Sequence, residues 1–439
     1  MIFLQNAVWL LVLIGVMILV HELGHFWAAR FFDVRVDAFS FGFGPRLFGF
    51  KHGETDFRFS AILFGGYVKM AGEQPTDDNV DDPRAFLAKP RWQRLVIAFA
   101  GPAMNVVLAV ALVTAMYMVQ FPKKPDSMQE GLIGYVVPGS PAAKAGLRAE
   151  DRIVAVDDAV KPDWDDIALK VVSSANRPLH VRIQRQGSEF WATVTPTLDE
   201  STGLGSVGWR AEGEIEIANV VAGLPAARCG LRKGDILLKA DGQPLRSRES
   251  LQQVIKAADG KPIDIEYARN DRPAHVMVQP VFDKLGGPSR WLIGVLPDFR
   301  VVITQLSFPQ ALRESVLRNI KGAGVIYQFL SNIVERRMSP KSISGPIGIA
   351  QLSGEAAREG ALPFIDLMAL VSLNLAIFNL LPIPILDGGV ILMLLVEMIM
   401  RRDLSLRVKE TVFKLGFVFL MAIMAFALYN DISKILPTG

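Results

Sequence analysis

Four long apolar stretches constrain the fold of this chain more than any other feature of its sequence. They cover residues 7–29, 96–119, 362–381 and 412–428. A helix of about 20 apolar residues crosses the hydrocarbon core of a bilayer, which is roughly 30 Å thick. The chain of 439 residues is 51% hydrophobic, so we expect a polytopic membrane protein with four transmembrane helices. The first stretch is not typical of a cleaved signal peptide, because no Lys or Arg precedes Val20.

Basic residues predict the orientation of these helices. Lys and Arg are frequent between the first and second stretches and again between the third and fourth. Basic loops stay on the cytoplasmic side of a membrane, so we expect both segments there. Residues 120–361 and the C-terminal tail then lie outside, which is the periplasm if the chain sits in a bacterial inner membrane. The formal net charge of +3 is too small to indicate binding to nucleic acid.

The long outer segment contains an internal repeat. Residues 136–148 and 220–232 share the pattern Pro-Ala-Ala-x-x-Gly-Leu, and 220 − 136 gives an offset of 84 residues. The pattern predicts a short helix closed by glycine, followed in each copy by a β-rich run, at residues 179–185 and 263–267. An offset of 84 residues fits two small domains better than a solenoid. The pattern resembles bacterial PDZ domains.

The chain therefore divides into five predicted parts. Residues 1–119 form an N-terminal membrane part, and residues 361–439 form a C-terminal membrane part. PDZ-like domains cover residues 127–211 and 212–300, and amphipathic connecting helices cover residues 301–360. The expected fold class is an α-helical polytopic membrane protein with a membrane-associated β-hairpin or small sheet and two periplasmic α+β domains of PDZ type.

The motif HELGH at residues 21–25 lies inside the first apolar stretch. On a helix, His21 and His25 share one face, so both imidazoles can reach one Zn²⁺ while Glu22 points toward the water that it activates. Ionisable side chains are costly inside a membrane and are functional there by default. The sequence therefore predicts a zinc hydrolase with Glu22 as its catalytic base. Two polar histidines without a metal are the alternative, which the membrane setting disfavours.

A third ligand is needed, because catalytic zinc usually has three protein ligands. The single cysteine, Cys229, lies in the repeat, so His, Asp or Glu at membrane depth must supply the ligand. Asp387 is the best candidate, because it lies in the segment NLLPIPILDGG (379–389), which interrupts an apolar stretch. Irregular backbone is tolerated in a membrane only where protein or water covers it. Asp366 and Glu397 are the competitors, and capping of a helix is the alternative role for Asp387.

These features together resemble the site-2 protease family of intramembrane zinc metalloproteases, in its bacterial type with two PDZ domains. Further agreement lies in FGFGP (41–45), GGYVKM (65–70), GPAMN (101–105) and SGPI (344–347). The resemblance covers nearly the whole chain. It implies an endopeptidase that cleaves transmembrane segments of membrane proteins already trimmed by a first protease. The implied substrates are an anti-sigma factor and, as a further possibility, signal-peptide remnants, and the active site lies toward the cytoplasm.

The sequence also predicts how a substrate is held. Residues 39–50 and 56–70 are rich in aromatic residues and glycine, and we expect a β-hairpin that pairs with an extended substrate strand through residues such as Gly66 and Tyr67. A hairpin that only packs on the helices is the alternative. The resemblance implies that Asn374 and Asn379 contact the substrate backbone, for which hydrogen bonding between helices is the alternative. It also implies that the PDZ-like pair excludes substrates with bulky outer domains.

Two other functions compete with the peptidase. A membrane PDZ scaffold with a vestigial metal site would not need Glu22, yet the base and all three inferred ligands are present. A metal transporter would also place ionisable residues in its spans, but a single HExxH motif and large outer domains fit it poorly. We therefore favour a zinc endopeptidase in which Glu22 moves the proton. Its partners are a transmembrane protein substrate and the lipid bilayer, without nucleic acid.

Overall fold

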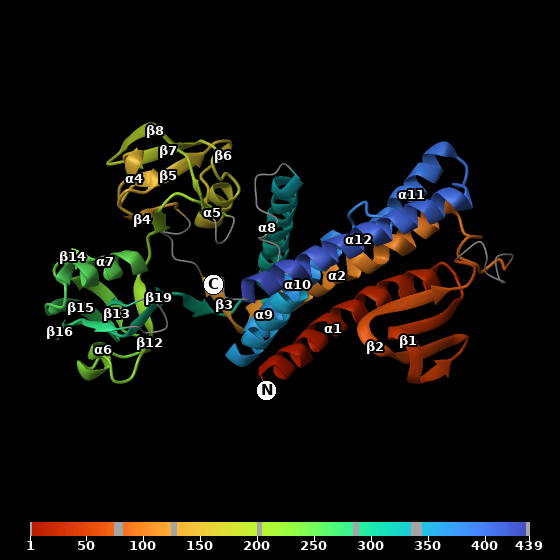
Figure 1. Cartoon of the computed structure of the whole chain (residues 1–439), viewed down its shortest axis with the longest axis horizontal. Helices are drawn as coiled ribbons and strands as arrows, with labels where there is room; N and C mark the ends of the chain where they lie inside the picture. The colour runs from red at the N-terminus through yellow and green to blue at the C-terminus, as the bar shows by residue number, and fades with distance from the viewer. Residues whose placement is uncertain are drawn as a thin grey trace. The chain divides into compact units, whose positions relative to one another are not determined.

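The computed structural model describes residues 2–73, 82–123, 130–199, 204–283, 289–334 and 345–435 (Figure 1). Ser344 of the SGPI motif and residues 127–129 and 335–343 of the predicted parts lie outside these ranges. The chain forms two compact units. Unit 1 comprises Met1–Phe121, Gln305–Leu330 and Ile343–Gly439, and unit 2 comprises Pro122–Thr304 and Ser331–Ser342.

Among the residues that the structure describes, unit 1 contains four helices that are long and apolar enough to cross a membrane, in agreement with the four predicted stretches. They are α1 (Ile2–Phe31), α2 (Arg91–Val119), α10 (Ala361–Asn379) and α12 (Leu406–Ile435). The other helices of this unit are α8 (Phe308–Val334), α9 (Pro346–Glu359) and α11 (Asp387–Met400).

Helix α2 is the element on which unit 1 is assembled, because α1, α10 and α11 all pack against it. Small residues at a helix interface let two backbones approach closely. A Cβ added to Gly24 of α1 would lie only 2.3 Å from the carbonyl oxygen of Ala100 on α2. Helices α1 and α2 are therefore in backbone contact at the level of the HELGH motif.

The third membrane crossing is broken between α10 and α11. Ala369 in the middle of α10 packs with Val113 of α2, whereas Asp403, just after α11, pairs with Arg91 at the start of α2. The two helices thus follow one another along α2. Helix α11 has 14 residues and rises about 21 Å, which is too short to cross a bilayer. The break places Asp387 at the first residue of α11, inside the membrane part.

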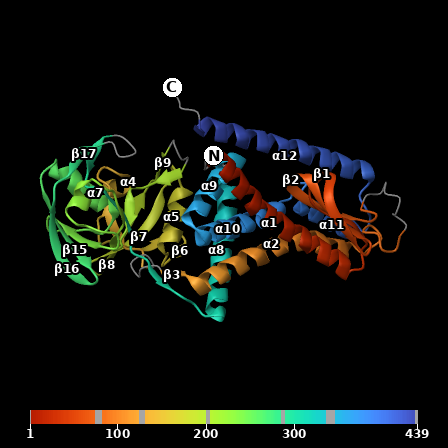
Figure 2. The same cartoon turned by 90° about the horizontal axis from the view of Figure 1, so that it is seen from below.

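Helix α12 is the least buried of the four long helices, with 11% of its apolar window buried against 39% for α2 (Figure 2). Near its start, Lys409 Nζ lies 2.7 Å from Oε1 of Glu397 on α11. Near its end, the carboxylate of Asp431 accepts hydrogen bonds from the first backbone N–H groups of α9. Between these points, Gly416 lies against Pro384 in the break, where an added Cβ would be 2.9 Å from the proline Cβ.

Strands β1 (Val36–His52) and β2 (Thr55–Met70) form a bent antiparallel hairpin at one end of α1 (Figure 1). Residues 38–41 of β1 pair with two parts of β2, residues 56–59 on one side and residues 66–69 on the other. Gly42 and Gly44, whose φ angles are +92° and +86°, supply the bend in β1. The segment 66–70 is consequently one edge of the sheet.

An ion-pair cluster outside the spans ties the tip of this hairpin to the end of α1. Arg84 binds the carboxylate of Glu54 through both of its terminal nitrogens, at 3.0 and 2.6 Å. Arg30 of α1 donates to the same carboxylate at 2.6 Å, and Arg84 also reaches Asp33 at 2.9 Å. Arg84, and then Arg30, hold the pKa of the Glu54 carboxyl below its ordinary value of 4.5.

Unit 2 contains two copies of one fold. The first comprises β4 (Ile133–Val136), α4 (Pro141–Lys144), β5 (Arg152–Val156), β6 (Ala159–Val160), α5 (Trp164–Val172), β7 (Leu179–Arg185), β8 (Ser188–Val194), β9 (Thr197–Asp199), β10 (Leu204–Ser206) and β11 (Trp209–Ala211). The second comprises β12 (Ile215–Val220), α6 (Pro225–Arg228), β13 (Ile236–Ala240), β14 (Gln243–Pro244), α7 (Arg248–Ala258), β15 (Ile263–Arg269), β16 (Arg272–Val278), β17 (Val281–Asp283), β18 (Arg290–Leu292) and β19 (Val295–Phe299). Strands β3 (Phe121–Lys123) and β20 (Val302–Thr304) pair where the chain enters and leaves this unit.

The predicted short helix closed by glycine occurs in both copies, as α4 followed by Gly146 and α6 followed by Gly230, with φ angles of +78° and +84°. A buried aspartate follows at the same offset. Asp151 lies 2.6 Å from Arg185, and Asp235 lies 2.7 Å from Arg269. Each carboxylate also accepts a backbone N–H three residues earlier in the chain. The repeat in the sequence therefore encodes a repeated ion pair in which the aspartate is buried and the arginine is partly exposed.

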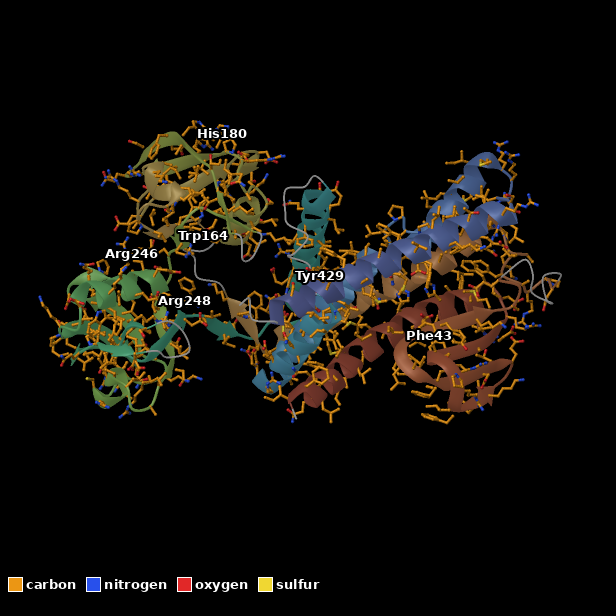
Figure 3. The ribbon with its side chains drawn as sticks, viewed as in Figure 1. Phe43, Trp164, His180, Arg246, Arg248 and Tyr429 are labelled. Atoms are coloured by element: carbon orange, nitrogen blue, oxygen red, sulfur yellow. The ribbon has the colours of Figure 1, made fainter. Side chains whose placement is uncertain are left out.

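The two histidines of unit 2, His180 and His275, lie outside the candidate metal cluster found among the described residues. His180 is exposed on β7 of the first copy (Figure 3). His275 of β16 is exposed and faces Asp264 at 3.4 Å. Neither belongs to a cluster of three candidate ligands among the described residues.

We expect Glu54→Gln to loosen the hairpin tip, because it removes the charge that holds both arginines. Exposed ion pairs contribute modestly, so hydrogen exchange at residues 51–60 should become roughly two- to fivefold faster. In the wild type, the pKa of Glu54 is lower in the folded protein than its ordinary value of 4.5. The ionised Glu54 therefore stabilises the fold at pH values above 4.5, and this stabilisation is lost as the pH falls through the lowered pKa. Exchange should therefore also accelerate, relative to the intrinsic rate, below about pH 4.5. Lys51→Gln, near the end of β1 beside this turn, is the control, and equal effects of both variants would contradict the assignment.

Candidate metal centre and active-site cleft

The three side chains predicted to hold a metal lie together. The Nε2 atoms of His21 and His25 are 3.2 Å apart. The carboxylate of Asp387 places Oδ2 at 3.1 Å from Nε2 of His21 and Oδ1 at 3.4 Å from Nε2 of His25. The histidines lie one turn apart near the C-terminal end of α1, and Asp387 comes from the start of α11. Among the described residues, these three side chains form a group whose ligand atoms all lie within 4.8 Å of one another, close enough to hold one metal ion.

The spacing of these atoms fits zinc. A tetrahedral Zn²⁺ site has metal–ligand bonds of about 2.0–2.1 Å, which separates neighbouring ligand atoms by about 3.3 Å. The three measured separations are 3.2, 3.1 and 3.4 Å. Two imidazoles and one carboxylate are also a common donor set of catalytic zinc sites. The residues present therefore match the donors, number and spacing that zinc requires.

The two competitors for the third ligand position have other partners. Asp366 lies 2.5 Å from Arg318 of α8. Glu397, with a side chain that is only 1% exposed, contacts Lys409 and accepts the backbone N–H of Leu404 at 3.0 Å. Neither residue lines the cavity beside the histidines. Both carboxylates bind other elements of unit 1 instead.

Helix α2 supports the back of the histidine pair. Nδ1 of His25 donates a hydrogen bond to the carbonyl oxygen of Ile97 at 2.8 Å, and Nδ1 of His21 lies 3.2 Å from the side-chain amide of Asn105. Between these two residues, Gly101 faces the rings. A Cβ added there would lie 2.3 Å from Nε2 of His25 and 2.9 Å from Cε1 of His21. Only glycine leaves room for both imidazoles.

Glu22 lies against the sheet edge formed by residues 66–70. Glu22 and Val68 line the same cavity, and the N–H of Met70 donates a hydrogen bond to Oε2 of Glu73 at 3.4 Å. Alternate residues of a strand direct their backbone groups to the same side, so Gly66, Val68 and Met70 present theirs to the cleft. An added Cβ on Gly66 would lie 3.2 Å from Cγ of Glu22. The sheet edge and the candidate base are thus in contact.

A cavity of about 320 Å³ opens beside these groups. Tyr67, Gly66 and Asn379 line it, and Nδ2 of Asn379 is 3.5 Å from Nε2 of His21. Asn374 lies earlier on α10, is half-buried and does not line the cavity. Its other lining residues are His21, Glu22, His25, Val68, Met70, Glu73, Phe86, Ile97, Ala98, Ile385, Leu386, Asp387 and Val390. Phe43 of β1, which Figure 3 labels on the hairpin, stacks its ring on Tyr67 at a centroid distance of 6.1 Å.

Sequence reasoning missed three residues of this site. Ile97 acts through its backbone carbonyl, which no side-chain pattern reveals. Glu73 follows the hairpin directly, and its position at the cleft depends on how residues 66–69 of β2 pair with residues 38–41. Asn105 belongs to GPAMN, where an amide inside an apolar stretch was the available signal.

One broken apolar helix beside a cluster of two histidines and a carboxylate, with an adjacent glutamate, is the arrangement expected of a membrane metallopeptidase. The family model described as peptidase family M50 matches residues 9–423. The chain therefore belongs to peptidase family M50, and it is a zinc metalloprotease.

Relatives match along nearly the full length. The chain is 32% identical over 452 residues to the regulator of sigma-E protease RseP of Salmonella typhimurium, covering 98% of this chain and 99% of the relative. It is 31% identical over 454 residues to RseP of Escherichia coli, covering 99% of both chains. A relative in Ralstonia nicotianae, named as a zinc metalloprotease, is 32% identical over 459 residues and covers 96% of this chain and 97% of its own. The PDZ domain of an SdrC-like protein from Listeria monocytogenes matches 20% of this chain and 87% of its own with 24% identity and a TM-score of 0.17.

We expect Gly101→Ala to weaken metal binding, because the added methyl group occupies space that the two imidazoles need. Displacing a ligand or its support typically lowers metal affinity tenfold or more. A chelator should therefore remove zinc from the variant at a concentration at least roughly tenfold lower than from the wild type. Zinc affinity of the detergent-purified protein measures this. The control is Gly324→Ala on α8, where an added Cβ meets nothing within 4 Å. Wild-type affinity in a folded Gly101→Ala protein would contradict the close contact.

Proposed function

We propose that the chain is an intramembrane zinc endopeptidase that cleaves transmembrane segments of membrane proteins. The convergence of His21, His25 and Asp387 beside Glu22, at a sheet edge within the membrane part, is the observation that carries the proposal. Relatives named regulator of sigma-E protease support an anti-sigma factor as the substrate, after a first cleavage outside the membrane. Clearance of signal-peptide remnants is a further activity of the same site.

His21, His25 and Asp387 would hold the metal through Nε2, Nε2 and the carboxylate. When bound, zinc supplies a Lewis acid that polarises the scissile carbonyl and acidifies water. Glu22 accepts a proton from the attacking water at its carboxylate and returns it to the leaving amine. Cγ of Glu22 would lie 3.2 Å from a Cβ added to Gly66, so the proton acceptor stands against the sheet edge, beside the position of an extended substrate.

The sheet edge gives the substrate a place to unwind. A transmembrane helix satisfies its own backbone hydrogen bonds, and in lipid each group left unpaired costs several kcal/mol. An extended segment can instead pair with an exposed sheet edge. Gly66 and Val68 present backbone groups to the cleft, and Tyr67 and Asn379 line it. We assign Gly66, Tyr67 and Asn379 to substrate binding, and Asn374 to a contact that a bound substrate would reach along α10.

We expect Glu22→Gln to retain zinc and to lose cleavage of a model transmembrane peptide by at least 100-fold, because the amide cannot accept the proton. Bound zinc and peptide turnover of the purified protein in detergent measure the two effects separately. Glu355→Gln, an exposed change on α9, is the matched control and should behave as the wild type. Turnover by a zinc-loaded Glu22→Gln protein would remove Glu22 from this role, and zinc without turnover in the wild type would favour a scaffold.

The proposal places the metal site toward the cytoplasm and the PDZ-like copies in the periplasm. Basic residues flank the cytoplasmic ends of α1, α2 and α11, as the positive-inside rule requires. In the second copy, β19 is the outer strand of its sheet and borders a cavity of about 460 Å³ together with α7. Such an edge can take an extended peptide. The pair would then act as a size filter that admits only trimmed substrates.

Removing the filter should broaden selectivity. We expect replacement of residues 130–300 by a short Gly/Ser linker to permit cleavage of a substrate that keeps a folded outer domain, because both PDZ-like copies are removed. Strands β3 and β20 remain in this variant and can still pair at the junction. Cleavage of this substrate in proteoliposomes, compared with its pre-trimmed form, measures the effect. Both proteins should cleave the trimmed form. Unchanged selectivity of the shortened protein would contradict a filter.

A further inference from the structure

The two imidazoles of the metal cluster differ in what supports them. Both present Nε2 to the cluster and Nδ1 to α2. Nδ1 of His25 has a carbonyl acceptor, the oxygen of Ile97 at 2.8 Å. Nδ1 of His21 instead lies 3.2 Å from Nδ2 of Asn105, which is the amide nitrogen. The first contact suits a metal ligand and the second does not.

The chemistry of a metal-bound histidine explains this difference. The nitrogen that binds a metal carries no proton, so the ring proton of a neutral imidazole is on the other nitrogen and needs an acceptor. An amide nitrogen is a donor, and two donors cannot bond to each other. At the same time, Oδ1 of Asn105 is buried and has no hydrogen-bond partner. One rearrangement, a 180° rotation of the amide, satisfies both groups, and the two orientations of an amide have nearly the same shape.

We propose that Asn105 is the positioning residue for His21. With its amide rotated, Oδ1 accepts the proton of His21 Nδ1 and directs Nε2 to the metal. This inference rests on the proposed zinc site and adds the partner that sets the tautomer and ring orientation of one ligand. Asn105 is itself rigidly placed, since it is 0% exposed and its backbone oxygen accepts the hydroxyl of Ser372 at 2.8 Å.

The positions along α2 support the same arrangement. Ile97 and Asn105 are eight residues apart, which is about 12 Å along a helix, and Gly101 stands midway between them. The rings fit over Gly101, and each ring sends its Nδ1 toward one end of this segment. Helix α2 therefore provides one acceptor for each histidine. An amide oxygen can accept the hydrogen bond from His21 without adding a charge, and a further charge inside the membrane would be costly.

The test compares substitutions that keep or remove the acceptor. Asn105→Asp keeps an oxygen toward His21, whereas Asn105→Leu has a similar shape and no acceptor. Thr114→Val is the matched control, because it removes a buried hydroxyl from α2 that bonds to Ser315 and not to the histidines. Zinc affinity is measured by chelator competition on the detergent-purified full chain. The absorption spectrum of the Co²⁺-substituted protein reports ligand geometry independently of activity.

Loss of a partner that orients a ligand typically weakens metal binding about 10- to 100-fold, and we expect this loss for Asn105→Leu together with a changed Co²⁺ spectrum. Asn105→Asp and Thr114→Val should stay within about threefold of the wild type. Wild-type affinity in Asn105→Leu would overturn the inference, and so would an equal loss in Asn105→Asp. If Asn105→Leu does not fold, a tenfold loss in Asn105→Asp overturns it and retained affinity supports it. A wild type that binds no zinc would instead refute the proposed function.

Discussion

The contact between α1 and α2 at Gly24 and Gly101 is the constraint on which the rest of the site depends. Gly24 brings the backbones together, and Gly101 leaves the space that the imidazoles of His21 and His25 fill. Because the helices touch at this level, the carbonyl of Ile97 and the amide of Asn105 come within reach of the rings. One neighbouring helix thus supports both histidines of the candidate metal cluster.

The other half of the site is made by interruptions of regular structure. The break between α10 and α11 puts Asp387 opposite the histidines, and the pairing of residues 66–69 of β2 with the outer side of residues 38–41 brings the edge at Gly66 to Glu22. Unpaired backbone is tolerated at membrane depth only inside protein or beside a water-filled cavity. Both interruptions border the same cavity, so the irregular backbone of both segments faces protein and this cavity.

Sequence reasoning predicted the parts of this architecture that depend on local spacing. The i, i+4 pair His21 and His25 lies on one helix face, and the prolines and glycines around Asp387 mark the break. The short helices of the two repeats also follow from their glycines. Apolar spans, in contrast, are hydrophobic on all sides, so their sequences do not show which face meets which neighbour. The roles of Ile97, Asn105 and Glu397 arise only from contacts between distant segments, and those contacts could not be predicted.

The attachment of α12 links the site to the thickness of the surrounding bilayer. Its two fixed points, Lys409 and Asp431, are 22 residues apart by 431 − 409, which corresponds to about 33 Å of helix. A free span adapts to a thicker or thinner membrane by tilting, but this helix cannot tilt without stretching one attachment. The stress would fall on its contact with Pro384, three residues before Asp387. A change in lipid chain length would thus strain α12, although this helix contributes no ligand.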